Sequence, residues 1–254
     1  RDGRITKADV LTFLRSWPAE PEPAATPRAE PPRITPGLPQ VDEDRPQKRV
    51  PMSRLRARIA ERMLHASQST AMLTTFNEVN MQPVMELRAR HKEAFEQQHG
   101  VRLGFMSFFV RASAEALKRH PDINASIDGD EIVYHGFQDI GIAVSTERGL
   151  MVPVIRGVAE KGVFELAREL MEVSAKARQG KLLPADMQGG SFSISSLGGI
   201  GGSAFTPIVN APEVAILGVG RASMKPVWNG SEFEPRLMMP LSLSYDHRLI
   251  DGAD

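Results

Sequence analysis

The uneven placement of proline is the feature that most constrains what this chain can fold into. Ten of the 19 prolines lie between Pro18 and Pro51, and alanine, glutamate, threonine and arginine fill most of the positions between them. A segment with so few aliphatic side chains cannot bury a core, and frequent proline favours extended polyproline II. We therefore expect residues 15–48 to be a disordered linker that reaches on the order of 100 Å, and residues 49–254 to hold the ordered domain.

The residues ahead of this linker have the pattern of a short helix. Thr6 is a suitable N-cap, and a small apolar stripe follows it. A helix of about ten residues is not stable alone. Residues 1–14 are therefore predicted to be the end of a small domain. Because the chain opens at Arg1 without an apolar signal segment, we interpret it as a fragment of a soluble protein.

Composition excludes several classes of function. Lysine and arginine total 31, as do aspartate and glutamate, so the net charge is zero, whereas nucleic-acid binders and proteins of anionic membrane surfaces need a basic excess. No apolar run reaches about 18 residues, so no membrane span is expected. The chain has no cysteine, which rules out disulfides, cysteine-ligated zinc and a protein thiol as nucleophile. Its six histidines are scattered singly, so we expect no metal site.

Beyond the linker, the hydrophobic pattern predicts helices and strands in mixed order. Ser53 can cap a helix whose apolar residues recur at spacings of three and four. A second predicted helix begins at Pro83 and stops at Gly100, and two more cover 106–119 and 163–179. Residues 72–81 alternate between polar and apolar side chains, which predicts a strand. Further strands or apolar runs cover 125–127, 131–134, 140–145, 150–155, 191–197, 214–219, 236–239 and 241–247. Because helices and strands do not alternate strictly, we predict an α+β fold, a two-layer sandwich of a mixed sheet and helices.

A predicted strand near the C-terminus carries the first candidate site. With the two-residue period of a strand, His247 shares a face with Leu241, Leu243 and Tyr245, so it is predicted to be at least partly buried. A buried neutral imidazole can act as a general base near pH 7. The alternative is a core histidine that is satisfied by a backbone carbonyl. Asp251 either holds the following loop by an ion pair or is an ordinary turn aspartate.

A glycine-rich stretch carries the second candidate site. Ser191, Ser193 and Ser195 share one face of a predicted strand, opposite Phe192 and Ile194. This polar face either meets water or turns Ser195 toward a reaction cleft, where its hydroxyl donates a hydrogen bond to an oxyanion. The glycines that follow permit close approach of a ligand, but they match neither the dinucleotide-binding nor the phosphate-loop fingerprint.

The string DHRLIDG at residues 246–252 resembles a known signature. It is similar to that of the dihydrolipoyl acyltransferases, the core components of 2-oxo acid dehydrogenase complexes, and is shared with chloramphenicol acetyltransferase. The resemblance covers nearly the whole chain in the right order. Residues 1–14 resemble the end of the peripheral-subunit-binding domain, residues 15–48 the Ala/Pro-rich linker, and residues 49–254 the catalytic domain. It implies a chloramphenicol-acetyltransferase-like fold and trimers with active sites between subunits.

The resemblance also implies an activity. Family members transfer an acyl group between the thiol of a lipoyl arm, carried on a separate domain, and the thiol of coenzyme A. His247 would take the thiol proton, Ser195 would hydrogen-bond the oxyanion and Asp251 would orient the site. Because both nucleophiles arrive on cofactors, the protein needs no cysteine of its own.

The implied partners and compartment follow from the same family. The partners are further copies of the chain, as a homotrimer that builds toward a larger cage, together with the dehydrogenase and dihydrolipoamide dehydrogenase subunits held by the binding domain. The implied compartment is the bacterial cytoplasm, in preference to the mitochondrial matrix. The chain stops at Asp254, whereas family members continue through a segment that contributes contacts between trimers, so we expect this fragment to lack those contacts.

The acyl group is ambiguous because the chain resembles a mosaic. Residues 50–135 resemble the succinyl-transferring member of the 2-oxoglutarate dehydrogenase complex, and residues 186–240 resemble the acetyl-transferring member of the pyruvate dehydrogenase complex. In the succinyl type, a serine and a histidine thought to hold the distal carboxylate fall at Gly202 and Gly220 here. Neither glycine can pair with a carboxylate, and an unpaired buried carboxylate is costly. We therefore expect acetyl transfer, with succinyl transfer as the alternative.

Two hypotheses from other classes remain. One is a non-catalytic scaffold that only tethers partner enzymes, against which the intact string 246–252 and Ser195 argue. The other is a free-standing acetyltransferase that acts on a small hydroxyl compound. The linker and the binding-domain remnant argue against that enzyme, because it needs neither.

Overall fold

The computed structural model describes residues 48–252 together with Lys7 and Thr12. The chain divides into two units, residues 1–50 and 51–254, and the elements that follow all belong to the second unit. The predicted binding-domain remnant (1–14) and linker (15–48) lie outside the described residues, except for Lys7, Thr12 and Lys48.

Helices and strands occur in the predicted mixed order. The helices are α2 (Arg54–Ser69), α3 (Gln82–His99), α4 (Phe105–Arg119) and α5 (Val163–Arg178), with the 3-10 helices η1 (Pro121–Asn124), η2 (Val158–Glu160) and η3 (Pro184–Met187). The strands are β1 (Met72–Asn80), β2 (Ala125–Asp128), β3 (Glu131–Tyr134), β4 (Ile140–Ile142), β5 (Val144–Thr146), β6 (Gly149–Met151), β7 (Val154–Ile155), β8 (Phe192–Ser196), β9 (Ala215–Val219), β10 (Ser223–Trp228) and β11 (Phe233–Asp246).

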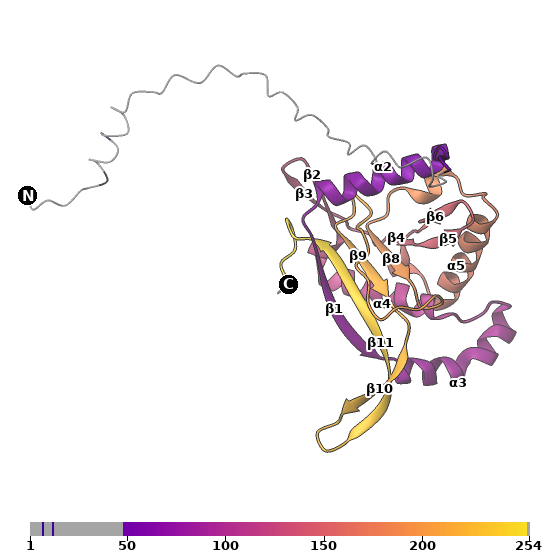
Figure 1. The fold of residues 1–254 in the computed structure, drawn as a ribbon. Coiled ribbons are helices and arrows are strands. Elements are labelled where there is room, and N and C mark those ends of the chain that lie inside the picture. The colour runs from indigo at the N-terminus through magenta and orange to yellow at the C-terminus, as the bar shows by residue number, and fades with distance from the viewer. Residues whose placement is uncertain (1–6, 8–11, 13–47, 253–254) are drawn as a thin grey trace, which may run out of the picture. The chain divides into compact units, whose positions relative to one another are not determined.

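A seven-stranded mixed sheet forms one layer of this unit (Figure 1). Its order is β1-β11-β9-β8-β4-β7, and β10 pairs with the first part of β11. Strand β8 runs parallel to both β4 and β9, and the remaining pairs of this sheet are antiparallel. Two small hairpins, β2–β3 and β5–β6, lie outside it. The prediction of an α+β fold with a mixed sheet is confirmed.

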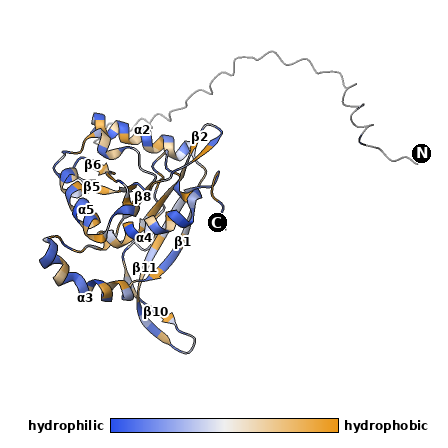
Figure 2. Cartoon of the chain, turned by 180° about the vertical axis from the view of Figure 1, so that it is seen from behind, coloured by the Kyte–Doolittle hydropathy of each residue, from blue (hydrophilic) through white to orange (hydrophobic). Residues whose placement is uncertain are grey.

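Helices α4 and α5 supply the second layer. Figure 2, seen from behind, shows α4 crossing the strands of the sheet. Val110 of α4 and Leu166 of α5 are fully buried in one core with Ile140 and Ile194 of the sheet. Each such side chain contributes about 1.5–3 kcal/mol when it is removed from water. The apolar faces of two helices therefore hold the central strands in place.

The predicted helix boundaries have the expected local causes. The Ser53 hydroxyl caps α2, accepting a hydrogen bond from the backbone N–H of Arg56 at 3.2 Å. Gly100 ends α3 in the left-handed region at φ 65°, a conformation that costs glycine little. Both boundaries agree with the prediction from sequence.

Strand β11 differs from the prediction, which divided it at Pro240. It is a single strand of 14 residues, and its partner β10 was not predicted. Pro240 is tolerated because β11 changes neighbours there: Met238 still pairs with β10, whereas Leu241 pairs with β9. The missing N–H of Pro240 therefore falls where the ladder is interrupted, and its carbonyl still accepts a hydrogen bond from the N–H of Gly220.

A buried carboxyl group lies beneath strand β8. Glu213 is only 4% exposed, and its Oε1 accepts a 2.9 Å hydrogen bond from the Asn210 amide. Its Oε2 has no partner among the described residues, and Ser193 lies close to the carboxyl without a hydrogen bond to it. Burial raises the pKa of Glu213 to about 7, although Ser193, Asn210 and the charge of Arg62 act in the opposite direction.

This raised pKa predicts how stability depends on pH. The carboxyl is more easily ionised in the unfolded chain, where its pKa is 4.5, than in the fold, where it is about 7. Its contribution to the free energy of unfolding is therefore fully present below pH 4.5 and is lost as the pH rises through 7, by at most about 3 kcal/mol. Glu213→Gln should remove this decline. Urea unfolding at several pH values checks it, with the exposed Glu232→Gln as control, and an unchanged pH dependence in Glu213→Gln would contradict it.

Candidate active site

Strand β8 carries Ser195 out of the core. Ser191 and Ser193 are each 1% exposed, whereas Ser195 is half-buried and Ser196 is exposed. The alternative that this polar face meets water is therefore wrong for the first two serines. The Ser191 hydroxyl instead bonds to the backbone of Asp139. Ser195 lies near the C-terminal ends of β8 and β9, and we call this end of the strands the serine end.

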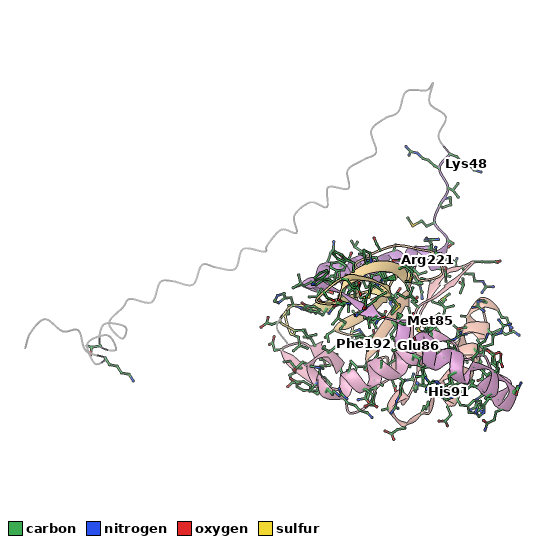
Figure 3. All side chains as sticks on the ribbon, turned by 90° about the horizontal axis from the view of Figure 1, so that it is seen from below. Lys48, Met85, Glu86, His91, Phe192 and Arg221 are labelled. Atoms are coloured by element: carbon green, nitrogen blue, oxygen red, sulfur yellow. The ribbon has the colours of Figure 1, made fainter. Side chains whose placement is uncertain are left out.

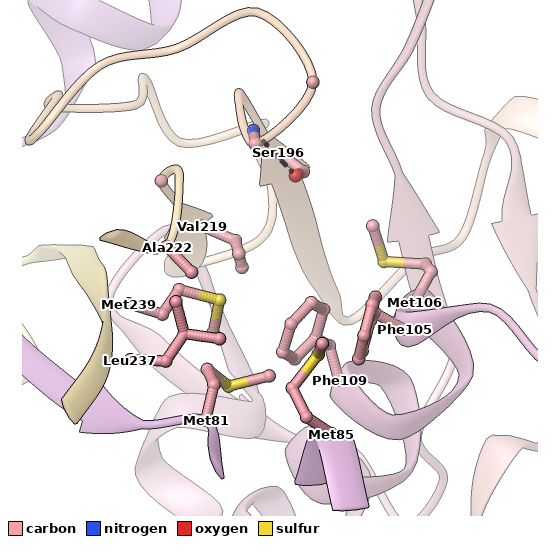
Figure 4. A pocket seen from close by; sticks show the side chains of 13 residues that line it. Met81, Met85, Phe105, Met106, Phe109, Ser196, Val219, Ala222, Leu237 and Met239 are labelled. Atoms are coloured by element: carbon pink, nitrogen blue, oxygen red, sulfur yellow. Dashed lines mark hydrogen bonds between the residues drawn. The ribbon is translucent and has the colours of Figure 1, made fainter. Parts of the chain in front are cut away.

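A glycine-rich loop follows Ser195 and turns beside the end of β9. The Ser196 hydroxyl accepts a 3.3 Å hydrogen bond from the N–H of Gly198 (Figure 4). Further along, the carbonyl of Gly202 accepts one from the N–H of Arg221. A Cβ at Gly220 would lie 3.3 Å from this carbonyl, so Gly202 and Gly220 are neighbours. That Cβ would also lie 2.6 Å from Pro240 Cγ, so any side chain at position 220 requires the proline ring to move.

A cavity of about 310 Å³ opens at the serine end (Figure 4). Gly220 lines it, as do Ser196 and the glycines that follow, but most of its wall is apolar. The apolar wall consists of Met81, Met85, Phe105, Met106, Phe109, Val219, Ala222, Leu237 and Met239. Helix α3 contributes Met85 to this wall, and Figure 3 labels Met85 together with Glu86 and His91 of the same helix. Such a wall favours an uncharged ligand group and offers no cation to a carboxylate.

His247 lies outside the strand that was predicted to contain it. Strand β11 ends at Asp246, and a turn begins at His247. The predicted continuation of the apolar face is therefore wrong at this residue, because the two-residue period ends one position earlier. In this protomer, 43% of the His247 side chain is exposed. An imidazole exposed to this extent is not a core histidine.

Asp251 approaches the His247 ring. The distance from His247 Nδ1 to Asp251 Oδ1 is 3.4 Å, and the Asp251 side chain is 76% exposed. A carboxylate at this nitrogen favours the tautomer that carries the proton on Nδ1, which leaves Nε2 free to accept one. The structure thus brings together two of the three residues to which the resemblance gave roles in the chemistry.

Ser195 is not near His247 in the same protomer. Ser195 pairs with Gly218 on β9, which pairs with Ser242 on β11. His247 lies five residues beyond Ser242, and two strand spacings separate β8 from β11. At about 3.3 Å per residue and 4.8 Å per strand, the two residues are roughly 19 Å apart. His247 therefore lies at the opposite end of the strands, which we call the histidine end.

Asp246, the residue before His247, lies in a polar environment at the histidine end. Asp246 is 1% exposed, and its carboxylate accepts hydrogen bonds from the side chain and N–H of Arg248 and from the N–H of Ala71. Burial acts to raise the pKa of Asp246, but these hydrogen bonds and the charge of Arg248 outweigh it and hold the pKa below its ordinary value. Asp246 and Glu213 line a second, more polar cavity of about 430 Å³.

Neither Asp246 nor Glu213 has a role predicted from the sequence. Asp246 had a usable signal, because it is an acidic residue placed next to the candidate base in the string 246–252. Glu213 had none, because its burial arises from the packing of a loop against β8. Within the part of the chain that the structure describes, no group of three or more histidine or acidic side chains could hold a metal ion, and no helix is long and apolar enough to cross a membrane.

Comparison with protein families gives one match that covers most of the chain. The model of the 2-oxoacid dehydrogenases acyltransferase (catalytic domain) family matches residues 44–254. Two similar curated proteins are dihydrolipoyllysine-residue succinyltransferase components of 2-oxoglutarate dehydrogenase complexes. The protein from Cupriavidus necator is 50% identical over 100% of this chain, and the one from Escherichia coli K12 is 50% identical over 99%. This chain spans 62% and 60% of their respective lengths.

Solved structures give the same family and the expected fold. The Azotobacter vinelandii dihydrolipoamide acetyltransferase is 46% identical with a TM-score of 0.82, covering 86% of this chain and 91% of that one. Chloramphenicol acetyltransferase, at 18% identity and a TM-score of 0.50 over 76% of this chain and 87% of that one, shares the fold alone. The resemblance of the chain to this family is thereby confirmed. The chain belongs to the 2-oxoacid dehydrogenase acyltransferases, and its residues 44–254 match their catalytic domain.

Proposed function

We propose that this chain transfers a succinyl group from a dihydrolipoyl arm to coenzyme A, as the core of a 2-oxoglutarate dehydrogenase complex. The observation that carries the proposal is its identity of about one half, over the whole chain, with proteins named for that activity. This choice reverses the expectation of acetyl transfer, which depended on Gly202 and Gly220 alone. The organisms of these relatives also favour the bacterial cytoplasm.

The proposed chemistry assigns one step to each end of the sheet. His247 Nε2 takes the proton from the coenzyme A thiol, and the thiolate sulfur attacks the carbonyl carbon of the succinyl thioester. The carbonyl oxygen becomes an oxyanion, to which the Ser195 hydroxyl donates a hydrogen bond. When the carbon–sulfur bond to the lipoyl arm breaks, the leaving thiolate receives the proton from His247. Asp251 holds the imidazole in the required tautomer, so the ring ends as it began.

This chemistry requires two protomers. Reacting groups must approach to about 3 Å, yet Ser195 and His247 of one chain are roughly 19 Å apart. We therefore propose that the serine end of one protomer faces the histidine end of the next, and that three protomers close the ring. A closed ring also shelters the exposed His247. The solved cubic core of the pyruvate dehydrogenase multienzyme complex, 45% identical with a TM-score of 0.82, supports assembly into a larger cage.

Acetyl transfer is the second candidate, and one observation favours it. The cavity beside Ser196 and Gly220 is walled by methionine, phenylalanine and leucine side chains and has no cationic lining residue. A succinyl carboxylate in that cavity would be desolvated without a partner. Succinyl transfer therefore requires that its carboxylate lie elsewhere, in the interface between protomers.

The roles of His247 and Ser195 predict different losses of activity. His247→Ala should lower kcat roughly 10³-fold, because no base remains for the thiol. Ser195→Ala should lower it roughly 10²–10³-fold, because one oxyanion donor is lost. Formation of acyl dihydrolipoamide from acyl-CoA and dihydrolipoamide measures both, with His91→Ala on exposed α3 as the control. If the His247→Ala variant turns over at the parent rate, the hypothesis of a non-catalytic scaffold takes the place of the proposed enzyme.

The two-protomer site predicts complementation between inactive variants. Ser195→Ala chains still supply His247, and His247→Ala chains still supply Ser195. Co-expression of the two should therefore restore measurable transfer, because some interfaces in the mixed oligomer contain both intact residues. The separately purified variants, mixed without subunit exchange, are the control. If co-expressed chains are found in one oligomer and remain as inactive as each variant alone, the site lies within one protomer and the proposal fails.

Competition between acyl donors tests which group is transferred. We expect a kcat/KM for succinyl-CoA at least about tenfold above that for acetyl-CoA, because a site that pairs a carboxylate discriminates against a donor without one. Propionyl-CoA, whose acyl group is longer than acetyl and carries no charge, separates the effect of acyl size from that of acyl charge. A clear preference for acetyl-CoA would establish the second candidate in place of the first.

A further inference from the structure

The connection between α2 and β1 is hydrogen-bonded to the histidine end through Ala71. The carbonyl of Ala71 accepts a 2.8 Å hydrogen bond from the N–H of His247, and the N–H of Ala71 donates a 3.2 Å hydrogen bond to Asp246 Oδ1. Both polar groups of one residue in this connection are therefore used to hold two consecutive residues, Asp246 and His247. The first bond joins two backbone groups, whereas the second requires the carboxylate of Asp246.

Arg248 holds that carboxylate from the other side. Its Nε lies 3.0 Å from Oδ1, its Nη2 lies 2.6 Å from Oδ2, and its backbone N–H lies 3.1 Å from Oδ1. This two-pronged pairing fixes the orientation of the carboxylate plane as well as its position. Asp246 is almost completely buried, whereas 49% of the Arg248 side chain is exposed. The pair therefore anchors the exposed turn to the buried end of β11.

The backbone of Asp246 completes the anchor. Its N–H donates to the carbonyl of Val214, and its carbonyl accepts from the N–H groups of Leu249 and Ile250. The turn that carries His247 is thus closed by two hydrogen bonds to the same residue whose side chain is held by Arg248 and Ala71. Among the described residues, His247 donates its backbone N–H to Ala71, its Nδ1 lies 3.4 Å from Asp251, and its ring centroid lies 6.3 Å from that of Tyr245.

We infer that Asp246 is a positioning residue that sets the location of the His247 imidazole through Ala71 and Arg248. The inference rests on the proposed function insofar as His247 is the base. Asp246 touches neither the imidazole nor a reacting atom, so it acts only through the backbone of the turn. A displacement of about 1 Å at a catalytic group can lower a rate about 10²-fold.

Asp246→Asn is the substitution that tests this role. The shape is kept, but the amide nitrogen cannot accept the N–H groups that now meet an oxygen, and the guanidinium of Arg248 loses its counter-charge. The turn should therefore lose its fixed position. We expect kcat to fall roughly 10²-fold while KM stays within about twofold, because the half-site for the substrate's acyl group lies at the serine end.

Asp139 offers a matched control in the same unit. It is also buried, at 8% exposed, and it accepts hydrogen bonds from the Arg156 side chain at 3.0 Å and from the N–H of Gly157 at 2.7 Å. Asp139→Asn breaks the same kind of pair, and among the described residues no hydrogen bond or ion pair links Asp139 to His247. It should lower stability to a similar degree and leave both kcat and the environment of His247 unchanged.

The experiment uses the assembled protein and two readouts. Steady-state kinetics give kcat and KM, and NMR of ring-labelled histidine reports the His247 imidazole, which is one of six in the chain and is assigned by its loss in His247→Ala. Asp246→Asn should move and broaden the His247 resonance, whereas Asp139→Asn should not. Equal kinetic losses in the two variants, or an unmoved His247 resonance in Asp246→Asn, would overturn the inference.

Two further outcomes are distinguishable. If the wild-type protein transfers no acyl group, the proposed function fails, while the NMR comparison still decides whether Asp246 positions His247. If Asp246→Asn does not fold, Arg248→Lys takes its place, because a lysine keeps the charge but cannot bridge both oxygens. Arg248→Lys should then lower kcat several-fold and move the His247 resonance, and an unmoved resonance would overturn the inference.

Discussion

The pairing of β11 with its neighbours is the interaction on which both ends of the candidate site depend. This strand pairs with β1, β9 and β10 along its 14 residues. Its first half contributes Leu237 and Met239 to the cavity at the serine end, and its last residue, Asp246, precedes His247. Ladder hydrogen bonds on both sides hold this strand in register with its neighbours. The two ends are therefore held apart within one chain, and the proposed chemistry requires a second chain to bring the two ends together.

The two carboxylates buried near β8 and β11 illustrate how partners decide the effect of burial. Glu213 and Asp246 both lose most of their hydration, which by itself raises a pKa. Asp246 regains hydrogen bonds from Arg248 and Ala71 and stays ionised, whereas Glu213 keeps one oxygen without a partner among the described residues and its pKa rises to about 7. The first group can serve as an anchor, and the second couples the stability of the fold to pH.

The identity of the transferred acyl group has to be argued separately from membership of the family, because different residues determine the two. Identity over the whole chain counts every position equally, whatever its distance from the acyl group. Selection between succinyl and acetyl depends on the few groups that surround the acyl carbon and its tail. The apolar cavity beside Gly220 and the whole-chain similarity therefore point to different donors. The two agree if the succinyl carboxylate lies outside that cavity, in the proposed interface between protomers.

The sequence by itself determined the elements with local causes. The Ser53 cap, the Gly100 stop, the helix periodicities and the alternation in β1 all reflect interactions within a few residues, and the string 246–252 identified the family. Only the tertiary structure decided that Pro240 does not interrupt β11 and that His247 lies beyond this strand and is exposed. It also decided that Ser195 lies at the end of the strands opposite to His247. It also decided that the Asp246 carboxylate is buried and accepts hydrogen bonds from Ala71 and Arg248. Each of these depends on which segments pair across long separations in the chain, and the hydrogen bonds that make those pairings leave no periodic trace in the sequence.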